Sequence, residues 1–310
     1  MNGIELARDF FIKHGKPMID EQFNEIKDRL AFGLVGEGSE CFYLDDSISQ
    51  DHDFEPGFCI WITREDEEKY GFKLERAYAK LPKEFEGYTR SVLNPCGGNR
   101  HGVLIIEDFY KKLIGNTRAP SSWQEWMQIP EDTLATATNG EVFEDNLGVF
   151  SAIRKELLAM PEDVKLKKIS AKMIKMGMSG QYNYKRCIEH KDSLAAQLTL
   201  AEFVKDAISV IYLLNNKYAP YYKLAARGMR KLEYLNDLEN DFIFLLETDN
   251  TKDFALTKQV IIEEIASKII KIVKERGLSE ATCNNLDSHG YSVLDHIKNL
   301  EIRNLHPMQD

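Results

Sequence analysis

Two short motifs in the N-terminal half combine residue types that could bind phosphate and a metal ion. Gly38 and Ser39 follow the apolar run Ala31–Gly36, and such small residues leave backbone N–H groups and a hydroxyl accessible to phosphate oxygens. Asp51 and Asp53 come next, separated by one residue. In an extended segment both carboxylates point to the same side, where Mg²⁺ would relieve their repulsion. The two motifs together predict a site for a metal-bound phosphate chain.

Turn chemistry, a calcium site and a zinc site are three alternatives to this prediction. An Asp-x-Asp sequence also occurs in turns and at helix N-caps, and this alternative stays open. An EF-hand loop starting at Asp45 is excluded, because its sixth position is Gln50 where glycine is needed and its twelfth is Pro56 where glutamate is needed. Cys187 and His190 form a lone pair without a second pair nearby, which disfavours a zinc site.

Positioning the two motifs requires a strand before Gly38 and another after Asp53. Runs of apolar and β-branched residues predict strands at residues 31–36, 58–63 and 103–106. Helical spacing predicts helices at residues 3–13, 20–30 and 64–81. After residue 118 almost every segment has helical periodicity. The sequence therefore predicts an α+β protein, with a small mixed β-sheet domain over residues 1–118 and a helical bundle over residues 119–310.

The longest predicted helices lie in the second half. Residues 193–215 and 257–276 are both amphipathic and long enough for a bundle. In the first of these, Leu194 and Leu198 are expected on the buried face, and Asp206 and Ser209 on the opposite face.

Composition limits the class of protein. The chain has 310 residues, of which 43% are hydrophobic and 29% charged, so fibrous and disordered classes are excluded. No apolar run is long enough to cross a membrane, and the first ten residues lack a secretory pattern, so we expect a cytoplasmic protein. The five scattered cysteines indicate free thiols.

Positive charge is concentrated in two stretches of an otherwise acidic chain. The net charge is −10, yet residues 164–188 contain seven basic residues and residues 216–232 contain five, with no acidic residue in either stretch. These stretches either face an anion or form solvated helix faces. The acidic total disfavours a general nucleic-acid binder.

The motifs resemble two known families. Gly38-Ser39 and Asp51-His52-Asp53 are similar to the signature of the polymerase-β-like nucleotidyltransferase superfamily. Segments 140–157, 179–187 and 218–223 resemble a bacterial family that joins a nucleotidyltransferase domain to a helical C-terminal domain with no assigned function.

The resemblance implies an enzyme that moves a nucleoside monophosphate from an NTP, with ATP expected, to a hydroxyl on a small molecule, protein or RNA. It implies up to two Mg²⁺ ions held by Asp51 and Asp53, and phosphate contacts from Gly38 and Ser39. The superfamily's third carboxylate would be Glu107, the first acid of the strand that begins near His101, although the centre of that strand is apolar.

The helical half is expected to contribute Arg186 and Lys223 to the nucleotide site. Lys223 is the expected triphosphate contact, because the arrangement resembles the helical domain of antibiotic nucleotidyltransferases. Each of these two residues lies in a short stretch that is rich in tyrosines and basic residues, which can stack on a base and neutralise phosphates. The alternative is that the tyrosines pack inside the bundle and the basic residues face solvent. A second functional class also stays open, namely a catalytically degenerate scaffold that senses nucleotides or binds a protein partner. An RNA acceptor would predict salt-sensitive RNA binding.

Overall fold

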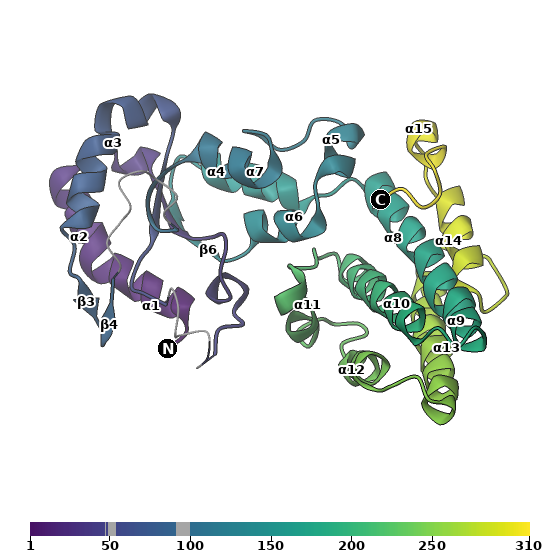
Figure 1. Ribbon diagram of the computed structural model, residues 1–310. Helices are drawn as coiled ribbons and strands as arrows, with labels where there is room; N and C mark the ends of the chain where they lie inside the picture. Colours follow the sequence, from purple (N-terminus) through teal and green to yellow (C-terminus); the bar gives the residue numbers. More distant parts are fainter. Residues whose placement is uncertain (47, 49–53, 91–99) are drawn as a thin grey trace. The chain divides into compact units, whose positions relative to one another are not determined.

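Two compact units make up the chain (Figure 1). The computed structural model describes residues 1–46, 48, 54–90 and 100–310. Unit 1 comprises residues 1–121 and 129–159, and unit 2 comprises residues 122–128 and 160–310. Helices account for 61% of the structure, beside a small mixed sheet. The predicted combination of a small sheet with many helices is confirmed.

Within each unit the helices and strands occur in the following order along the chain. Unit 1 contains α1 (Gly3–Phe10), a π-helical turn (Phe11–Gly15), α2 (Lys16–Gln22), β1 (Ala31–Leu34), β2 (Cys59–Ile62), α3 (Arg64–Ala79), β3 (Glu84–Phe85), β4 (Tyr88–Thr89), β5 (Gly102–Ile105), α4 (Ile106–Ile114), α6 (Glu131–Thr138), β6 (Glu141–Asp145) and α7 (Val149–Leu158). Unit 2 contains α5 (Trp123–Gln128), α8 (Glu162–Met176), a π-helical segment (Gly177–Tyr184), α9 (Lys185–Glu189), α10 (Ser193–Leu214), α11 (Tyr222–Met229), α12 (Glu239–Glu247), α13 (Lys252–Glu275), α14 (Leu286–Asp295) and α15 (Leu300–Arg303).

Four strands form the main sheet of unit 1, in the order β5-β2-β1-β6. β1 is antiparallel to both β2 and β6, whereas β2 is parallel to β5. All four residues of β2 are buried, as its continuous apolar sequence predicted. Gly33 is needed in β1 because a Cβ there would overlap the carbonyl oxygen of Glu141 in β6. The three strands predicted from sequence are therefore confirmed, with small shifts at their ends.

Helices cover both faces of this sheet (Figure 1). On one face, Phe32 and Ile60 pack into a core with apolar residues of α1, α2 and α3. On the other face, Trp61 of β2 stacks on Phe150 of α7 with their ring centroids 3.9 Å apart, and its edge meets Phe109 of α4. Alternation of side chains along β2 explains this division, since Ile60 and Trp61 must point to opposite faces.

Unit 1 departs from the sequence prediction at three places. Glu141–Asp145 forms strand β6, although no strand was predicted after residue 118, where almost every segment has helical periodicity. Because β6 pairs with β1, residues 129–159 belong to unit 1, and the compact units do not divide at residue 118. The helix predicted at residues 20–30 is also wrong, because α2 begins earlier, at Lys16 and Pro17, and ends at Gln22. The β3–β4 hairpin was missed.

In unit 2, α8 packs against both α10 and α14 (Figure 1). The hydroxyl of Ser170 in α8 donates to the Gly290 carbonyl of α14 at 2.8 Å, and a Cβ at Gly290 would lie 2.9 Å from the Ser170 carbonyl oxygen. These two small residues let the helices approach closely. In α10, Leu194 and Leu198 are exposed whereas Asp206 is buried, so the predicted buried face is wrong. A helix that neighbouring elements contact on several sides is buried on several faces, so residues outside its most apolar face are buried as well.

The basic stretch at residues 164–188 is largely engaged inside unit 2. Lys167 is fully buried, and its Nζ donates to the carbonyl oxygens of His306 at 2.7 Å and Pro307 at 3.0 Å. Burial lowers the pKa of Lys167 to about 8. Lys172 and Lys175 both pair with Asp310. These three lysines are therefore engaged by partners within unit 2, and the Lys175 side chain is 33% exposed.

None of the helices among the described residues is long and apolar enough to cross a membrane. The four cysteines within the described ranges are free thiols, as expected.

Candidate functional site

The loop that follows β1 contains two residues whose backbone conformation only glycine adopts readily. Gly36 and Gly38 have φ angles of +131° and +126°. A Cβ at Gly38 would also overlap the Arg100 guanidinium and lie 2.5 Å from the Glu40 carboxylate oxygens. Gly38 therefore brings the backbone directly against this ion pair, and any side chain at this position would have to displace Arg100 and Glu40.

A second segment fixes the position of this loop. The Oδ1 of Asn139 accepts from the Gly36 N–H at 2.9 Å, and its Nδ2 donates to the Gly36 carbonyl at 2.8 Å. The N–H of Gly140 donates to the Cys41 carbonyl at 2.7 Å. The Arg154 guanidinium of α7 in turn donates to the carbonyl oxygens of Asn139 and Gly140. The loop is thus held near both ends by the connection between α6 and β6.

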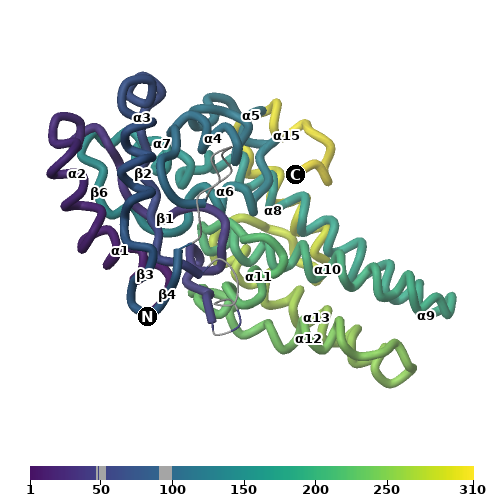
Figure 2. The backbone as a smooth tube through the Cα atoms, turned by 60° about the vertical axis from the view of Figure 1, so that its left-hand side comes forward, coloured from purple at the N-terminus to yellow at the C-terminus, as the bar shows by residue number. Residues whose placement is uncertain are grey.

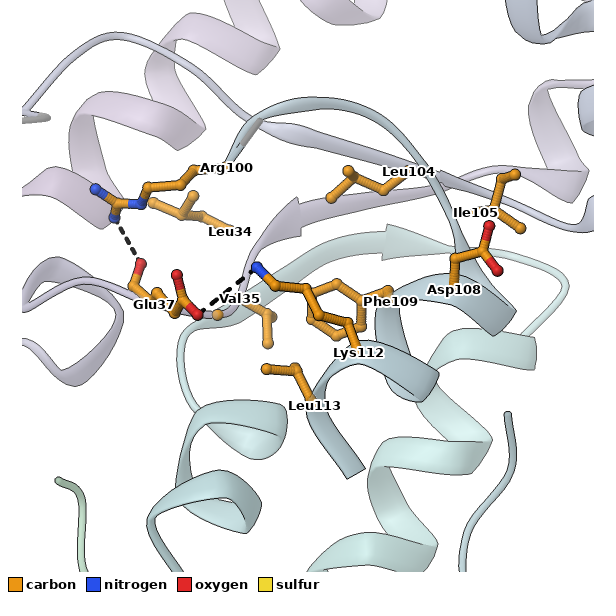
Figure 3. Close-up of a pocket in the computed structure, with 11 residues that line it drawn as sticks. Leu34, Val35, Glu37, Arg100, Leu104, Ile105, Asp108, Phe109, Lys112 and Leu113 are labelled. Carbon is orange, nitrogen blue, oxygen red and sulfur yellow. Dashed lines mark hydrogen bonds and ion pairs between the residues drawn. The ribbon is translucent and has the colours of Figure 1, made fainter. Parts of the chain in front are cut away.

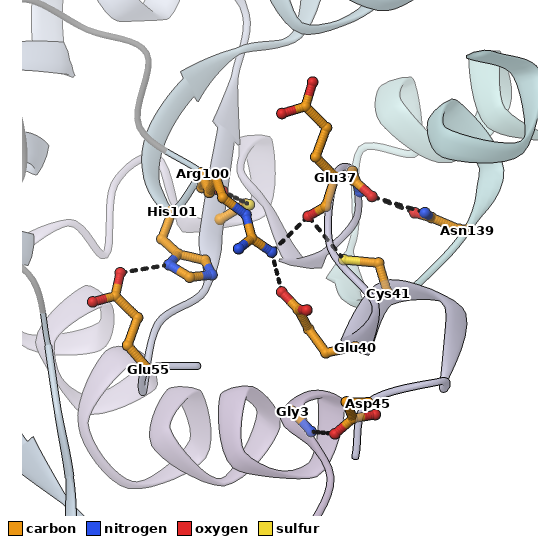
Figure 4. A network of polar contacts seen from close by, with 11 residues as sticks. Gly3, Glu37, Glu40, Cys41, Asp45, Glu55, Arg100, His101 and Asn139 are labelled. Atoms are coloured by element: carbon orange, nitrogen blue, oxygen red, sulfur yellow. Dashed lines mark hydrogen bonds and ion pairs between the residues drawn. The ribbon is translucent and has the colours of Figure 1, made fainter. Parts of the chain in front are cut away.

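Arg100 holds the loop from the opposite side (Figure 4). Its guanidinium pairs with the Glu40 carboxylate and donates to the Glu37 carbonyl at 2.6 Å. Arg100 comes just before β5, so it brings a positive charge from the sheet edge onto the loop. The Asn139 and Arg100 contacts together make this loop a preorganised element.

The tip of the loop carries hydrogen-bond donors that none of the described residues uses. Among the residues that the structure describes, no group accepts a hydrogen bond from the Gly38 N–H, the Ser39 N–H or the Ser39 hydroxyl. Both residues are partly exposed, so the donors are accessible. Backbone N–H groups and a hydroxyl beside a guanidinium are suited to binding a phosphate oxygen.

A cavity of about 280 Å³ lies beside the loop (Figure 3). It is bounded by the end of β1, by β5 and by α4. Its apolar lining includes Val35, Leu104, Phe109 and Leu113. Its charged lining consists of Glu37, Arg100, Asp108 and Lys112. Of the lining residues, the sequence motif contained Gly36 and Glu37, whereas the lining residues from Arg100 to Leu113 were not predicted as part of a site.

Glu107 lies where the sequence placed it, directly after β5, in the first turn of α4. Its carboxylate accepts from the Arg64 N–H at the start of α3, with oxygen–nitrogen distances of 3.2 and 3.4 Å. Its neighbour Asp108 lines the cavity and pairs with the Arg64 side chain. Glu107 therefore already serves as a structural acceptor between two elements.

The predicted metal ligands Asp51 and Asp53 lie outside the described residues. Within the described ranges no group of three or more His, Cys, Asp or Glu side chains could hold a metal ion. The donor chemistry of the predicted pair nevertheless fits Mg²⁺, which prefers a few carboxylate oxygens and leaves the remaining positions to water and phosphate.

Arg186 and Lys223 both lie in unit 2, and both side chains are exposed. Arg186 of α9 donates to the Tyr182 hydroxyl at 2.6 Å and lies over the Tyr182 ring. Lys223 belongs to α11. The two helices adjoin opposite ends of the 22-residue helix α10 (Figure 2), so unit 2 does not bring these residues together.

The buried thiols near the loop are not nucleophiles. Burial raises the pKa of Cys59 to about 12, and burial also raises the pKa of Cys41 well above its usual value. Both therefore stay protonated at neutral pH, and a thiol is a much weaker nucleophile than a thiolate. Covalent catalysis by these cysteines is disfavoured.

The comparison with family models gives one match. Residues 126–224 match a family described as "Domain of unknown function (DUF4037)". No curated protein and no solved structure matches the chain. The matched range includes Asn139, Gly140 and Arg154, as well as the three segments on which the resemblance to a bacterial family rested. It does not reach Gly38, Ser39, Asp51 or Asp53, and it names no activity.

Sequence reasoning missed Arg100, Asn139 and Arg154. Arg100 follows a glycine-rich turn and carries no spacing signal of its own. Asn139-Gly140 did offer a signal, because this dipeptide is typical of turns that precede a strand. That signal would also have predicted β6.

Proposed function

We propose that the protein is a nucleotidyltransferase that moves a nucleoside monophosphate from an NTP to a hydroxyl acceptor and releases pyrophosphate. The observation that carries the proposal is the loop tip at Gly38 and Ser39, whose accessible donors stand beside the Arg100 guanidinium. The position of the loop, between a buried strand and the Asp51–Asp53 pair, supports the same function.

Each residue has a defined role in this proposal. The Ser39 hydroxyl and the N–H groups of Gly38 and Ser39 would bind β- and γ-phosphate oxygens, and Arg100 would add a positive charge nearby. Asp51 and Asp53 would hold Mg²⁺. Magnesium, when bound there, would offset charge on the phosphates and lower the pKa of the acceptor hydroxyl.

A second candidate function is a nucleotide sensor on a degenerate transferase scaffold. The contact between Glu107 and the Arg64 N–H favours it. Glu107 is the acid that was proposed as the third carboxylate, and this contact shows that it already has a structural partner. A chain with two carboxylates would still bind a metal-bound nucleotide but turn it over poorly.

Pyrophosphate release separates the two functions. The purified chain is incubated with each NTP and Mg²⁺, with small-molecule, protein and RNA pools as acceptors. The proposal predicts release that falls at least about 100-fold in Asp51→Asn and Asp53→Asn, because each variant loses a metal ligand. Asp9→Asn, an exposed acid on α1, is the matched control and should keep full release. Nucleotide binding without release from any pool would favour the sensor.

A further inference from the structure

The cavity beside Gly36 combines an apolar floor with charges of both signs. Leu104, Phe109 and Leu113 line it and are each partly exposed, so these apolar side chains are incompletely covered by the protein itself. A volume of about 280 Å³ is at the lower end for ligand sites, so the space suits one small molecule rather than a lipid or a peptide. Gly36 keeps one wall open, since a Cβ there would meet only Phe109, at 3.9 Å.

The charged lining residues differ in their partners. Asp108 pairs with Arg64, and Arg100 pairs with Glu40. Neither Arg64 nor Glu40 lines the cavity. Glu37 and Lys112, in contrast, pair with each other at 3.6 Å from opposite walls (Figure 3).

The pair between Glu37 and Lys112 is weak and easily replaced. Their side chains are 62% and 68% exposed, and exposed ion pairs contribute little to stability. A ligand with an ammonium and a carboxylate could take over both charges without leaving either one unpaired. The rest of the ligand would then pack on the apolar side chains that line the cavity.

We propose that this cavity binds a free amino acid with an apolar side chain. The ammonium group contacts Glu37, the carboxylate contacts Lys112, and the side chain packs on Leu104, Phe109 and Leu113. This site adjoins the nucleotide site proposed at Gly38 and Ser39 and shares Arg100 with it, but its existence does not depend on nucleotidyl transfer.

A nucleobase fits the cavity less well. Among its described lining residues there is no Asn, Gln, Ser or Thr side chain to read the edge of a base. A purely anionic ligand also fits poorly, because it would leave Glu37 without its partner. The balanced charges favour a zwitterion.

Calorimetric titration of the full chain, without nucleotide or Mg²⁺, tests the proposal. L-phenylalanine and L-leucine are expected to bind with one site per chain. Phenethylamine lacks the carboxylate and 3-phenylpropanoate lacks the ammonium, so each is expected to bind at least about tenfold more weakly than L-phenylalanine. Adenosine is the probe for the nucleobase alternative.

Paired variants assign the two charges. Glu37→Gln and Lys112→Gln should each weaken L-phenylalanine binding at least about tenfold. The matched controls Glu75→Gln and Lys111→Gln change exposed residues away from the cavity lining and should bind normally. Leu113→Trp fills the floor and should abolish binding, with circular dichroism confirming that it remains folded.

Several results would overturn the proposal. These are no binding of either amino acid at millimolar concentration, equal binding of the two truncated analogues, preferred binding of adenosine, or normal binding by both charge variants. Because no nucleotide or metal is present, such a failure is independent of any result for NTP binding.

Discussion

At the scale of single residues, Gly38 and Arg100 define the loop on which the proposed function depends. Arg100 lies where a side chain at position 38 would have to be, and Glu40 holds its guanidinium there. The donors of Ser39 are left accessible beside this positive charge. The glycine was predictable from its motif, but Arg100 was not, because no local pattern links residues 38 and 100 before the strands are placed.

Asp206 is a residue whose ionisation opposes folding. It is buried in α10, and burial raises its pKa to about 6, although Lys172 lies 4.0 Å away. A carboxyl whose pKa is raised in the folded state favours folding at low pH, and this contribution is lost as the pH rises through about 6.

Asp206→Asn should therefore change the free energy of unfolding more favourably at neutral pH than at a pH of about 4. A pKa displaced by roughly two units corresponds to about 1–3 kcal/mol in the difference between the two effects. Urea denaturation of both proteins at each pH measures it, with Asp9→Asn as the control. An equal effect of Asp206→Asn at the two pH values would show that the carboxyl titrates normally.

At the scale of elements, the connection between α6 and β6 carries the loop of the candidate site. Asn139 binds Gly36 twice, and Gly140 binds Cys41, while Arg154 holds both carbonyl oxygens of the connection. Burial lowers the pKa of Arg154, yet guanidinium groups stay charged at any ordinary pH. This element was hidden in the sequence because its strand is short and reads Glu-Val-Phe-Glu-Asp, without the apolar run that identified the central strands.

Gly140→Ala should disturb this connection. The φ of Gly140 is +60°, and a Cβ there would overlap the carbonyl oxygen of Leu34 in β1. We expect a loss of about 1–3 kcal/mol in the free energy of unfolding, because both the backbone strain and the overlap must be relieved.

Gly115→Ala is the matched control for that loss. Gly115 has a similar φ of +73°, but a Cβ there would meet nothing within 4 Å. The free energy of unfolding of Gly115→Ala should therefore fall only by the amount needed to hold alanine in a left-handed backbone conformation. If the two variants unfold at the same urea concentration, the contact between β1 and the connection is not what makes Gly140 necessary.

At the scale of the whole molecule, the sequence predicted the α+β class and the three central strands but not the domain boundary. Buried strands with continuous apolar sequence were recognisable, as were the long helices of unit 2. The boundary depended on a long-range pairing between β1 and β6, which local periodicity does not encode. The burial of the basic stretch at residues 164–188 was not predictable for the same reason. Its lysines contact Asp310 and the carbonyl oxygens of residues 306 and 307, which are far away in the sequence.

The boundary can be tested with two fragments. Residues 1–118 lack β6 and α7, so β1 would lose a neighbouring strand and Trp61 would lose its stacking partner Phe150. This fragment should not unfold cooperatively. Residues 1–159 contain every strand of unit 1 and should show a cooperative denaturation curve. Cooperative unfolding of the shorter fragment would mean that β6 is dispensable.

The central claim is that Gly38, Ser39 and the Asp51–Asp53 pair bind a nucleoside triphosphate with Mg²⁺. Calorimetric titration of each NTP into the full chain, with and without Mg²⁺ and repeated on Asp53→Asn and Ser39→Ala, tests it most directly. We predict binding that requires Mg²⁺, is abolished by Asp53→Asn, and is weakened about tenfold by Ser39→Ala through the loss of one hydrogen bond to a charged group. Absence of binding by every NTP, or binding that both variants retain in full, would contradict the claim.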